Sequence, residues 1–302
     1  MIRRTLVCAC AIVGVLVTAC GGPAPARDGE IVVTTNILGD VVRSVVGDTA
    51  AVRVLMRPNA DPHSFGISAQ DAAAMGRAGL IVYNGLGLEE NVLRNVESVA
   101  AEGTPTLAVG DRIDPIRYAT GEGAGNPDPH FWTDPQRMVT AVDAIEEAVR
   151  GVAGIDGDAV SRNADSYRAQ LRALDASMQD GFGSVPADRR KLVTNHHVLG
   201  YLADRFGFTV IGAVVPSGTT LAAPSAADLQ SLVDAIESER VPAIFVDSSQ
   251  PEKLARVLAD EAGIHVAIVS LYSESLSPPG SPGDTYLDMM RANTGAIIAG
   301  LR

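Results

Sequence analysis

Cysteine is nearly missing from this sequence. The 302 residues contain three cysteines, Cys8, Cys10 and Cys20, and none follows position 20. Beyond that position the chain has no pair of cysteines for a disulfide and offers no thiolate to a metal ion. A chain of this length buries enough apolar surface to fold without disulfide bonds.

Aromatic and basic residues are also scarce. Phe, Trp and Tyr make up 4% of the chain, and 24 Lys and Arg stand against 36 Asp and Glu, which gives a formal net charge of −12. Such a surface does not neutralise phosphates, so the composition argues against a nucleic-acid partner. The acidic surface favours solubility and the approach of cations, without identifying one. Hydrophobic residues at 46% exclude a disordered chain.

Glycine-rich loops for nucleotides and long hydrophobic runs are both lacking. The stretch 84–90 (NGLGLEE) has one pair of glycines and not the spacing of a dinucleotide or phosphate loop. The apolar run 5–20 is too short and wrongly flanked for a membrane-spanning helix. Because it follows Arg3 and Arg4, it has the pattern of a signal peptide.

The end of that run resembles a bacterial lipobox. Small residues precede Cys20 in the tetrapeptide Val17-Thr18-Ala19-Cys20. We therefore expect residues 1–19 to be removed as a signal peptide and Cys20 to carry a diacylglycerol. Residues 20–29 then form a flexible, lipidated tether. The expected location is extracytoplasmic, lipid-anchored to the membrane of a bacterial cell.

From residue 30 onward, β-branched apolar runs alternate with amphipathic stretches, which predicts alternating strands and helices. We expect strands at 30–37, 51–56, 80–85, 105–110, 191–194, 208–214, 243–247 and 265–270. We expect helices at 38–47, 68–79, 88–101, 199–206, 225–239, 251–263 and 284–300, and one that starts near 134. This alternation predicts an α/β protein with parallel sheets and helices on both faces.

The middle of the chain predicts one long helix. From 158 to 180 there is no proline or glycine, and apolar residues recur every three or four positions. These residues are Val160, Ala164, Tyr167, Leu171, Leu174 and Met178. We interpret the helix as a rigid strut between an N-terminal lobe (30–155) and a C-terminal lobe (184–302), with 156–183 as the linking segment.

Histidine is rare, yet two of the five histidines follow the same dipeptide, in Asp61-Pro62-His63 and Asp128-Pro129-His130. Proline fixes its own φ and restricts the preceding residue, so each histidine leaves a stiff turn. A stiff, loop-borne imidazole suits a metal site or a catalytic site. Asp61 and Asp128 have either a turn-stabilising or an outer-sphere role, and the turn role is the one expected for both.

The predicted helix and strand ends place three of the histidines near one another. Asp134 as N-cap and Pro135 at the first helical position put His130 just before a helix. His63 follows the strand 51–56, and His196 follows the strand 191–194. Open α/β sheets bind ligands at the carboxyl ends of their strands, so the three imidazoles are expected to meet in a cleft between the lobes.

Four segments of the chain resemble the metal-binding lipoproteins of zinc and manganese ABC importers, and the resemblance covers essentially the whole mature chain. The segments are 57–65 (RPNADPHSF), 126–135 (NPDPHFWTDP), 194–208 (TNHHVLGYLADRFGF) and 270–293 (SLYSESLSPPGSPGDTYLDMMRAN). The resemblance implies two α/β lobes joined by a rigid helix, with the metal site in the cleft. It also implies one metal ligand in each segment, and these ligands fall on His63, His130, His196 and Glu274.

Two departures from the family pattern are visible. The family usually has aspartate at the fourth ligand position, and Glu274 is one methylene longer. Either Glu274 binds the metal directly, or water or a neighbour such as Asp247 takes that position. The second departure is the loop 117–129, which is glycine-rich and lacks the histidines that zinc importers often carry there.

The expected ligand set favours Zn²⁺. Three neutral imidazoles and one carboxylate form a tetrahedral N₃O set that suits zinc, whereas Mn²⁺ prefers more oxygen ligands. The resemblance adds that manganese-type relatives have a carboxylate where this chain has His196. His197 is expected to be a neighbour rather than a ligand, His265 a structural residue, and Trp132 a packing residue of its loop.

The leading interpretation is an extracytoplasmic protein that captures Zn²⁺ and delivers it to a membrane ABC permease, acting as a monomer and not as an enzyme. One alternative is a zinc-dependent hydrolase in which Glu274 is the general base, although no His-Glu-x-x-His motif supports it. Another alternative is a metal-binding adhesin or chaperone without a permease.

Overall fold

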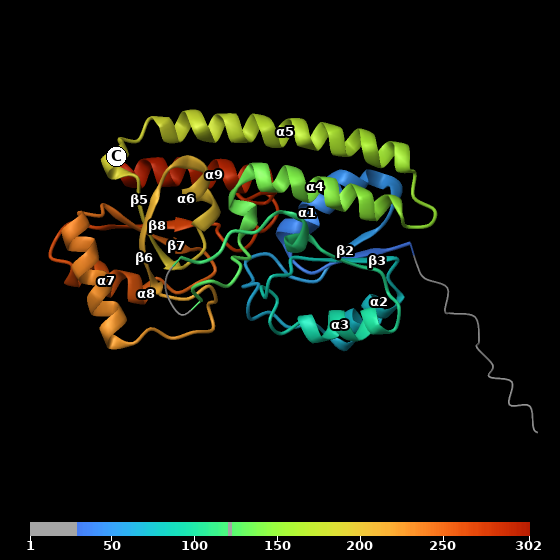
Figure 1. The fold of residues 1–302 in the computed structure, drawn as a ribbon, viewed down its shortest axis with the longest axis horizontal. Helices are drawn as coiled ribbons and strands as arrows, with labels where there is room; N and C mark the ends of the chain where they lie inside the picture. The colour runs from blue at the N-terminus through green and yellow to red at the C-terminus, as the bar shows by residue number, and fades with distance from the viewer. Residues whose placement is uncertain (1–28, 120–122) are drawn as a thin grey trace, which may run out of the picture.

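The computed structural model describes residues 29–119 and 123–302. The expected signal peptide, Cys20 and nearly all of the tether lie outside the described residues. Two four-stranded parallel sheets lie side by side, each flanked by helices, and one long helix runs past both of them (Figure 1). The predicted two-lobe α/β architecture is confirmed.

The N-terminal sheet has the strand order β2-β1-β3-β4, with all neighbours parallel. Its strands are β1 (Ile31–Val33), β2 (Val52–Val54), β3 (Leu80–Tyr83) and β4 (Thr106–Ala108). The helices of this half are α1 (Asn36–Val46), α2 (Ala69–Arg77), α3 (Leu93–Ala101) and α4 (Pro135–Arg150), with 3₁₀ turns η1 (Gly47–Thr49), η2 (Val109–Arg112) and η3 (Phe131–Thr133). β1 is buried on both faces, which explains its uninterrupted apolar sequence.

The C-terminal sheet repeats this plan with the order β6-β5-β7-β8, again parallel throughout. Its strands are β5 (Lys191–His196), β6 (Thr209–Val215), β7 (Ala243–Asp247) and β8 (Ala267–Leu271). The other elements are η4 (Ala187–Arg189), α6 (Gly200–Phe206), α7 (Ala226–Glu239), α8 (Lys253–Glu261) and α9 (Tyr286–Leu301).

The end of the first strand differs from the prediction because a side chain caps the next helix where the strand was expected to continue. The first strand stops at Val33, and Thr35 accepts a hydrogen bond from the Leu38 amide as the N-cap of α1. A threonine there satisfies an otherwise free helix amide. The predicted cap of α2 is confirmed, since Ser68 and Asp71 form a reciprocal capping box.

The long helix α5 (Gly157–Gly183) has 27 residues and lies along both lobes (Figure 1). At about 1.5 Å per residue it is roughly 40 Å long. All six apolar residues of the predicted stripe are buried. They belong to one hydrophobic core that includes β1 and β3 from the first sheet and β5 and β7 from the second. A core shared across both lobes makes α5 a stiff link rather than a hinge. Within the described residues, no helix combines the length and apolarity needed to cross a membrane.

Candidate metal centre

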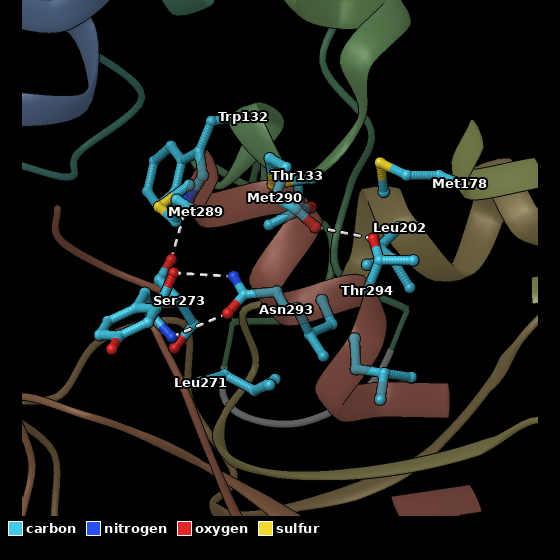
Figure 2. A pocket seen from close by; sticks show the side chains of 13 residues that line it. Trp132, Thr133, Met178, Leu202, Leu271, Ser273, Met289, Met290, Asn293 and Thr294 are labelled. Atoms are coloured by element: carbon cyan, nitrogen blue, oxygen red, sulfur yellow. Dashed lines mark hydrogen bonds between the residues drawn. The ribbon is translucent and has the colours of Figure 1, made fainter. Parts of the chain in front are cut away.

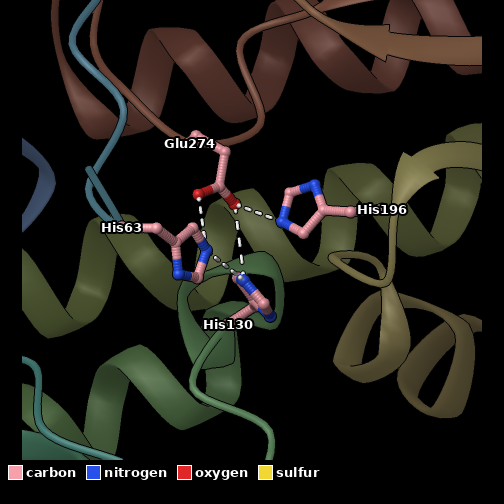
Figure 3. A group of neighbouring side chains, drawn as sticks. All are labelled: His63, His130, His196 and Glu274. Carbon is pink, nitrogen blue, oxygen red and sulfur yellow. Dashed lines mark hydrogen bonds and ion pairs between the residues drawn. The ribbon is translucent and has the colours of Figure 1, made fainter. Parts of the chain in front are cut away.

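Three imidazoles and one carboxylate from four distant segments meet at one buried point (Figure 3). They are His63, His130, His196 and Glu274, and each is at most 1% exposed. One ligand atom from each lies within 4.8 Å of the others. The Nε2 atoms of His63 and His130 are 3.4 Å apart. The Glu274 carboxylate oxygens lie 3.4 Å from Nε2 of His63 and of His196 and 3.5 Å from Nε2 of His130.

The topology of the two sheets brings these side chains together. His63 and His130 come from loops of the N-terminal lobe, after β2 and before α4. His196 and Glu274 come from the C-terminal lobe, at the end of β5 and just after β8. The strand predicted to end at residue 194 continues to His196, which is its last residue. The site therefore lies between the lobes at the carboxyl ends of the strands, as parallel sheets favour.

Both Asp-Pro-His turns are closed by the same hydrogen bond. The Asp61 carboxylate accepts from the His63 amide at 2.9 Å, and Asp128 accepts from the His130 amide at 2.9 Å. Both aspartates thus stabilise their turns, as expected from the sequence.

Asp128 has a second role besides closing its turn, because it also contacts the ring of His130. Its Oδ1 lies 2.7 Å from Nδ1 of His130. A carboxylate at Nδ1 holds the proton there and directs the Nε2 lone pair toward the centre, as in metal sites where a carboxylate orients a histidine ligand. The sequence alone did not separate these two roles for Asp128.

Asp247 holds Glu274 in place through hydrogen bonds to the backbone of its loop. Asp247 accepts hydrogen bonds from the amides of Ser273 and Glu274 at 3.1 Å and 3.0 Å. It also accepts from the Ser273 hydroxyl at 2.7 Å. The Asp247 carboxylate is therefore occupied with the loop, and the structure brings the longer Glu274 side chain, not Asp247, into the cluster.

A second set of contacts fixes the same loop from the other side (Figure 2). Trp132 donates from Nε1 to the Ser273 carbonyl at 2.9 Å. Asn293 of α9 exchanges two hydrogen bonds of 2.9 Å with the backbone of Tyr272. Trp132 is buried and packs its ring against His130 at a centroid distance of 5.3 Å. It packs as predicted, and it also ties the two lobes together.

The remaining histidines lie outside the cluster. His265 is exposed, just before β8. His197 lines a cavity of about 290 Å³ beside the cluster, with Tyr118 and Asp128. Tyr118 is a residue that sequence reasoning missed. Its hydroxyl lies 3.2 Å from Nδ1 of His130, so it covers that ring from outside. In the sequence, Tyr118 stands out only as an aromatic residue in a loop of mostly small and polar residues. That signal is too weak to identify it as part of the site.

The electrostatics of Glu274 and His130 suit a divalent cation. Burial tends to raise the pKa of Glu274, but the nearby imidazoles of His196, His130 and His63 lower it well below its ordinary value. Burial lowers the pKa of His130, despite the nearby Asp128 and Glu274 carboxylates. An ionised carboxylate and a neutral imidazole are the forms that bind a metal.

Hydrogen bonding within the cluster is incomplete. Among the described residues, Nε2 of His196 and both Glu274 carboxylate oxygens are buried and have no hydrogen-bond partner. Such buried polar atoms are destabilising unless something pairs with them. A cation bound by all four side chains satisfies them together, so the donor set fits a metal ion.

Two α/β lobes linked by a shared helix, with a polar cluster buried between them, define a binding protein of the helix-linked, two-lobe class. The sequence profile of the family described as "Zinc-uptake complex component A periplasmic" matches residues 31–300. The chain belongs to this family of periplasmic metal-binding proteins, which serve ABC transporters as substrate-binding components and are not enzymes. Family membership therefore rejects the hydrolase alternative.

Individual relatives differ in the metal that their names state. The zinc-binding protein TroA of Treponema pallidum is 32% identical, and the alignment covers 99% of each chain. Its solved structure superposes with a TM-score of 0.82, at 30% identity over 91% of this chain and 99% of that one. The manganese-binding lipoprotein MntA of Bacillus subtilis (strain 168) is 29% identical over 99% of this chain and 100% of its own. The iron-binding protein YfeA of Yersinia pestis is 27% identical over 91% of this chain and 87% of its own.

Proposed function

We propose that this protein captures Zn²⁺ outside the cytoplasm and delivers it to a membrane ABC permease. The observation that carries the proposal is the buried set of three imidazole Nε2 atoms and one carboxylate around a single point. Four protein ligands, two from each lobe, enclose an ion and remove it from water. A substrate-binding protein needs this arrangement to hold a metal ion until it reaches the permease.

The ligand chemistry supports zinc over manganese. Zn²⁺ has no geometric demand beyond a compact, four-coordinate shell and binds imidazole well. Mn²⁺ favours carboxylate, carbonyl and water oxygens, and here nitrogen supplies three of the four donors. The zinc-binding name of TroA agrees with this choice. Other relatives are named for manganese and iron, so membership of the family does not distinguish zinc from these metals. The proposal of zinc therefore depends on the donor set.

Elemental analysis of protein purified without added metal tests the proposal. We expect about one zinc per chain, and we expect zinc to displace manganese when both are supplied at equal concentration, because the Irving–Williams order places Zn²⁺ well above Mn²⁺ at nitrogen ligands. Stable retention of manganese in the presence of equimolar zinc would refute zinc as the substrate. Copper is included in the competition, since it binds the same ligands at least as tightly in principle.

We further propose that a diacylglycerol on Cys20 holds the protein at the membrane. The support is the small-residue sequence before Cys20 and the polar tether after it. The Cys20→Ala variant is expected to lose labelling by a radioactive fatty acid and to move from the detergent phase to the aqueous phase. Undiminished labelling of the variant would contradict the assignment. A Cys8→Ala variant is the matched control, because that cysteine lies within the segment expected to be removed.

A further inference from the structure

One short turn of the C-terminal lobe crosses to the N-terminal lobe beside the metal centre. It comprises residues 217–220, between β6 and α7, and we name it the cleft turn. Thr220 donates from its hydroxyl to Oδ2 of Asp61 at 2.6 Å. Thr219 donates from its hydroxyl to Oε1 of Glu90 at 2.7 Å. Two hydroxyls of one lobe therefore hydrogen-bond two carboxylates of the other.

Both carboxylates also face His63. Asp61 accepts the amide of His63 through its other oxygen, Oδ1, at 2.9 Å. Glu90 Oε1 lies 3.9 Å from Nδ1 of His63. That nitrogen is buried and has no hydrogen-bond partner among the described residues. The two threonine hydroxyls therefore position one carboxylate that closes the Asp-Pro-His turn of His63 and another that faces the outer edge of its ring.

The cleft turn also touches the surroundings of the other two histidines. A Cβ atom on Gly218 would come within 2.3 Å of the Tyr118 hydroxyl, so the absence of a side chain lets Tyr118 lie against the turn. The same hydroxyl is 3.2 Å from Nδ1 of His130. The Ser217 carbonyl accepts from the amide of His197 at 3.0 Å, next to His196. One turn thus contacts residues that adjoin each of the three histidines.

We propose that Thr219 and Thr220 are positioning residues that set how fast the bound metal leaves, without being ligands themselves. The inference rests on the proposed metal-binding function. In this proposal the ion leaves when His63 separates from His196 and Glu274 in the opposite lobe. That separation also breaks the two hydroxyl–carboxylate hydrogen bonds, so their strength adds to the barrier for release. Hydrogen bonds to ionised carboxylates are the strong kind, and each is expected to slow release by about tenfold.

The test is a Thr219→Val/Thr220→Val double variant, which keeps the shape of both side chains and removes both hydroxyls. Zinc release is timed with an excess of a chromophoric chelator, and the site itself is monitored by the visible spectrum of bound Co²⁺. We expect release to be about a hundredfold faster, with the Co²⁺ spectrum and the stoichiometry unchanged. The Thr219→Ser/Thr220→Ser variant keeps the hydroxyls and is expected to restore slow release.

The matched control is Thr209→Val, because Thr209 is exposed in the same lobe and begins β6, at the end of the strand opposite to the cleft turn. Release that stays within about twofold of wild type in the double valine variant would overturn the proposal, as would a changed Co²⁺ spectrum, which indicates that the ligands themselves moved. Failure of the wild-type protein to bind zinc or cobalt at all is a different result. It would overturn the proposed function and, with it, this inference.

Discussion

Alanine at His63, His130 or His196 is expected to weaken zinc binding by about two to three orders of magnitude in each case. Four-ligand zinc sites provide roughly 10–16 kcal/mol of apparent binding free energy. One ligand therefore accounts for about 3 kcal/mol or more, before the effect of exposing the remaining buried groups. Isothermal titration calorimetry with a competing chelator measures the change.

Matched controls lie within the same chain. His197 is the neighbour of His196, and His265 is exposed before β8; neither belongs to the cluster. Alanine at either position should leave zinc affinity within about threefold of wild type, as is usual for a change outside the ligand set. Near-wild-type affinity in any two of the three cluster variants would reject the assigned ligands.

Glu274→Ala is expected to have a smaller effect than the histidine variants, because water is able to replace a carboxylate oxygen at zinc. The visible spectrum of cobalt-substituted protein separates direct binding from an outer role. An unchanged cobalt spectrum in Glu274→Ala would remove Glu274 from the ligand set. A shifted spectrum together with reduced affinity supports it as the fourth ligand.

His196→Asp is expected to reduce the preference for zinc over manganese by about a hundredfold. The substitution replaces a nitrogen donor by an oxygen donor, and a set of two imidazoles and two carboxylates suits the harder Mn²⁺ ion better. Position 196 ends β5 next to Glu274, with 3.4 Å between His196 Nε2 and the carboxylate. The second carboxylate therefore enters the same cluster. Competition between the two metals, followed by elemental analysis, measures the ratio.

The control for this exchange is His197→Asp, which makes the same change of residue one position further along. His197 faces the Tyr118 side of the loop and not the cluster, with 6.3 Å between the two ring centroids. We expect its zinc-to-manganese ratio to remain that of wild type. An unchanged ratio in His196→Asp, with both metals still bound, would show that this position does not determine the metal preference.

Prediction from the sequence was most accurate where the signal is local. The apolar stripe of α5 is a repeat of 3.6 residues, and all six predicted residues are buried. The caps at Ser68 and Asp134 depend on residues two or three positions away. The paired Asp-Pro-His turns close through a hydrogen bond between residues two positions apart. Each of these features depends on residues that are close together in the chain, so it is predictable from the sequence.

Prediction was weaker where the cause lies far along the chain. One difference had a local cause: the first strand is shorter than its β-branched run, because Thr35 caps α1. The ring contact of Asp128 depends on the rotamer of His130, which the cleft decides. The hydrogen bond between Thr220 and Asp61 joins residues 159 positions apart, and no local pattern indicates it.

By itself, the sequence determined the alternation of strands and helices, the long amphipathic helix and the chemistry of the candidate ligands, because these follow from periodicity and residue type. Only the tertiary structure decided that His63, His130, His196 and Glu274 share one buried point and that Asp247 holds the loop instead of joining them. The physical reason is that coordination depends on distances of a few ångströms between atoms from different lobes. Those distances exist only after both sheets have packed against α5.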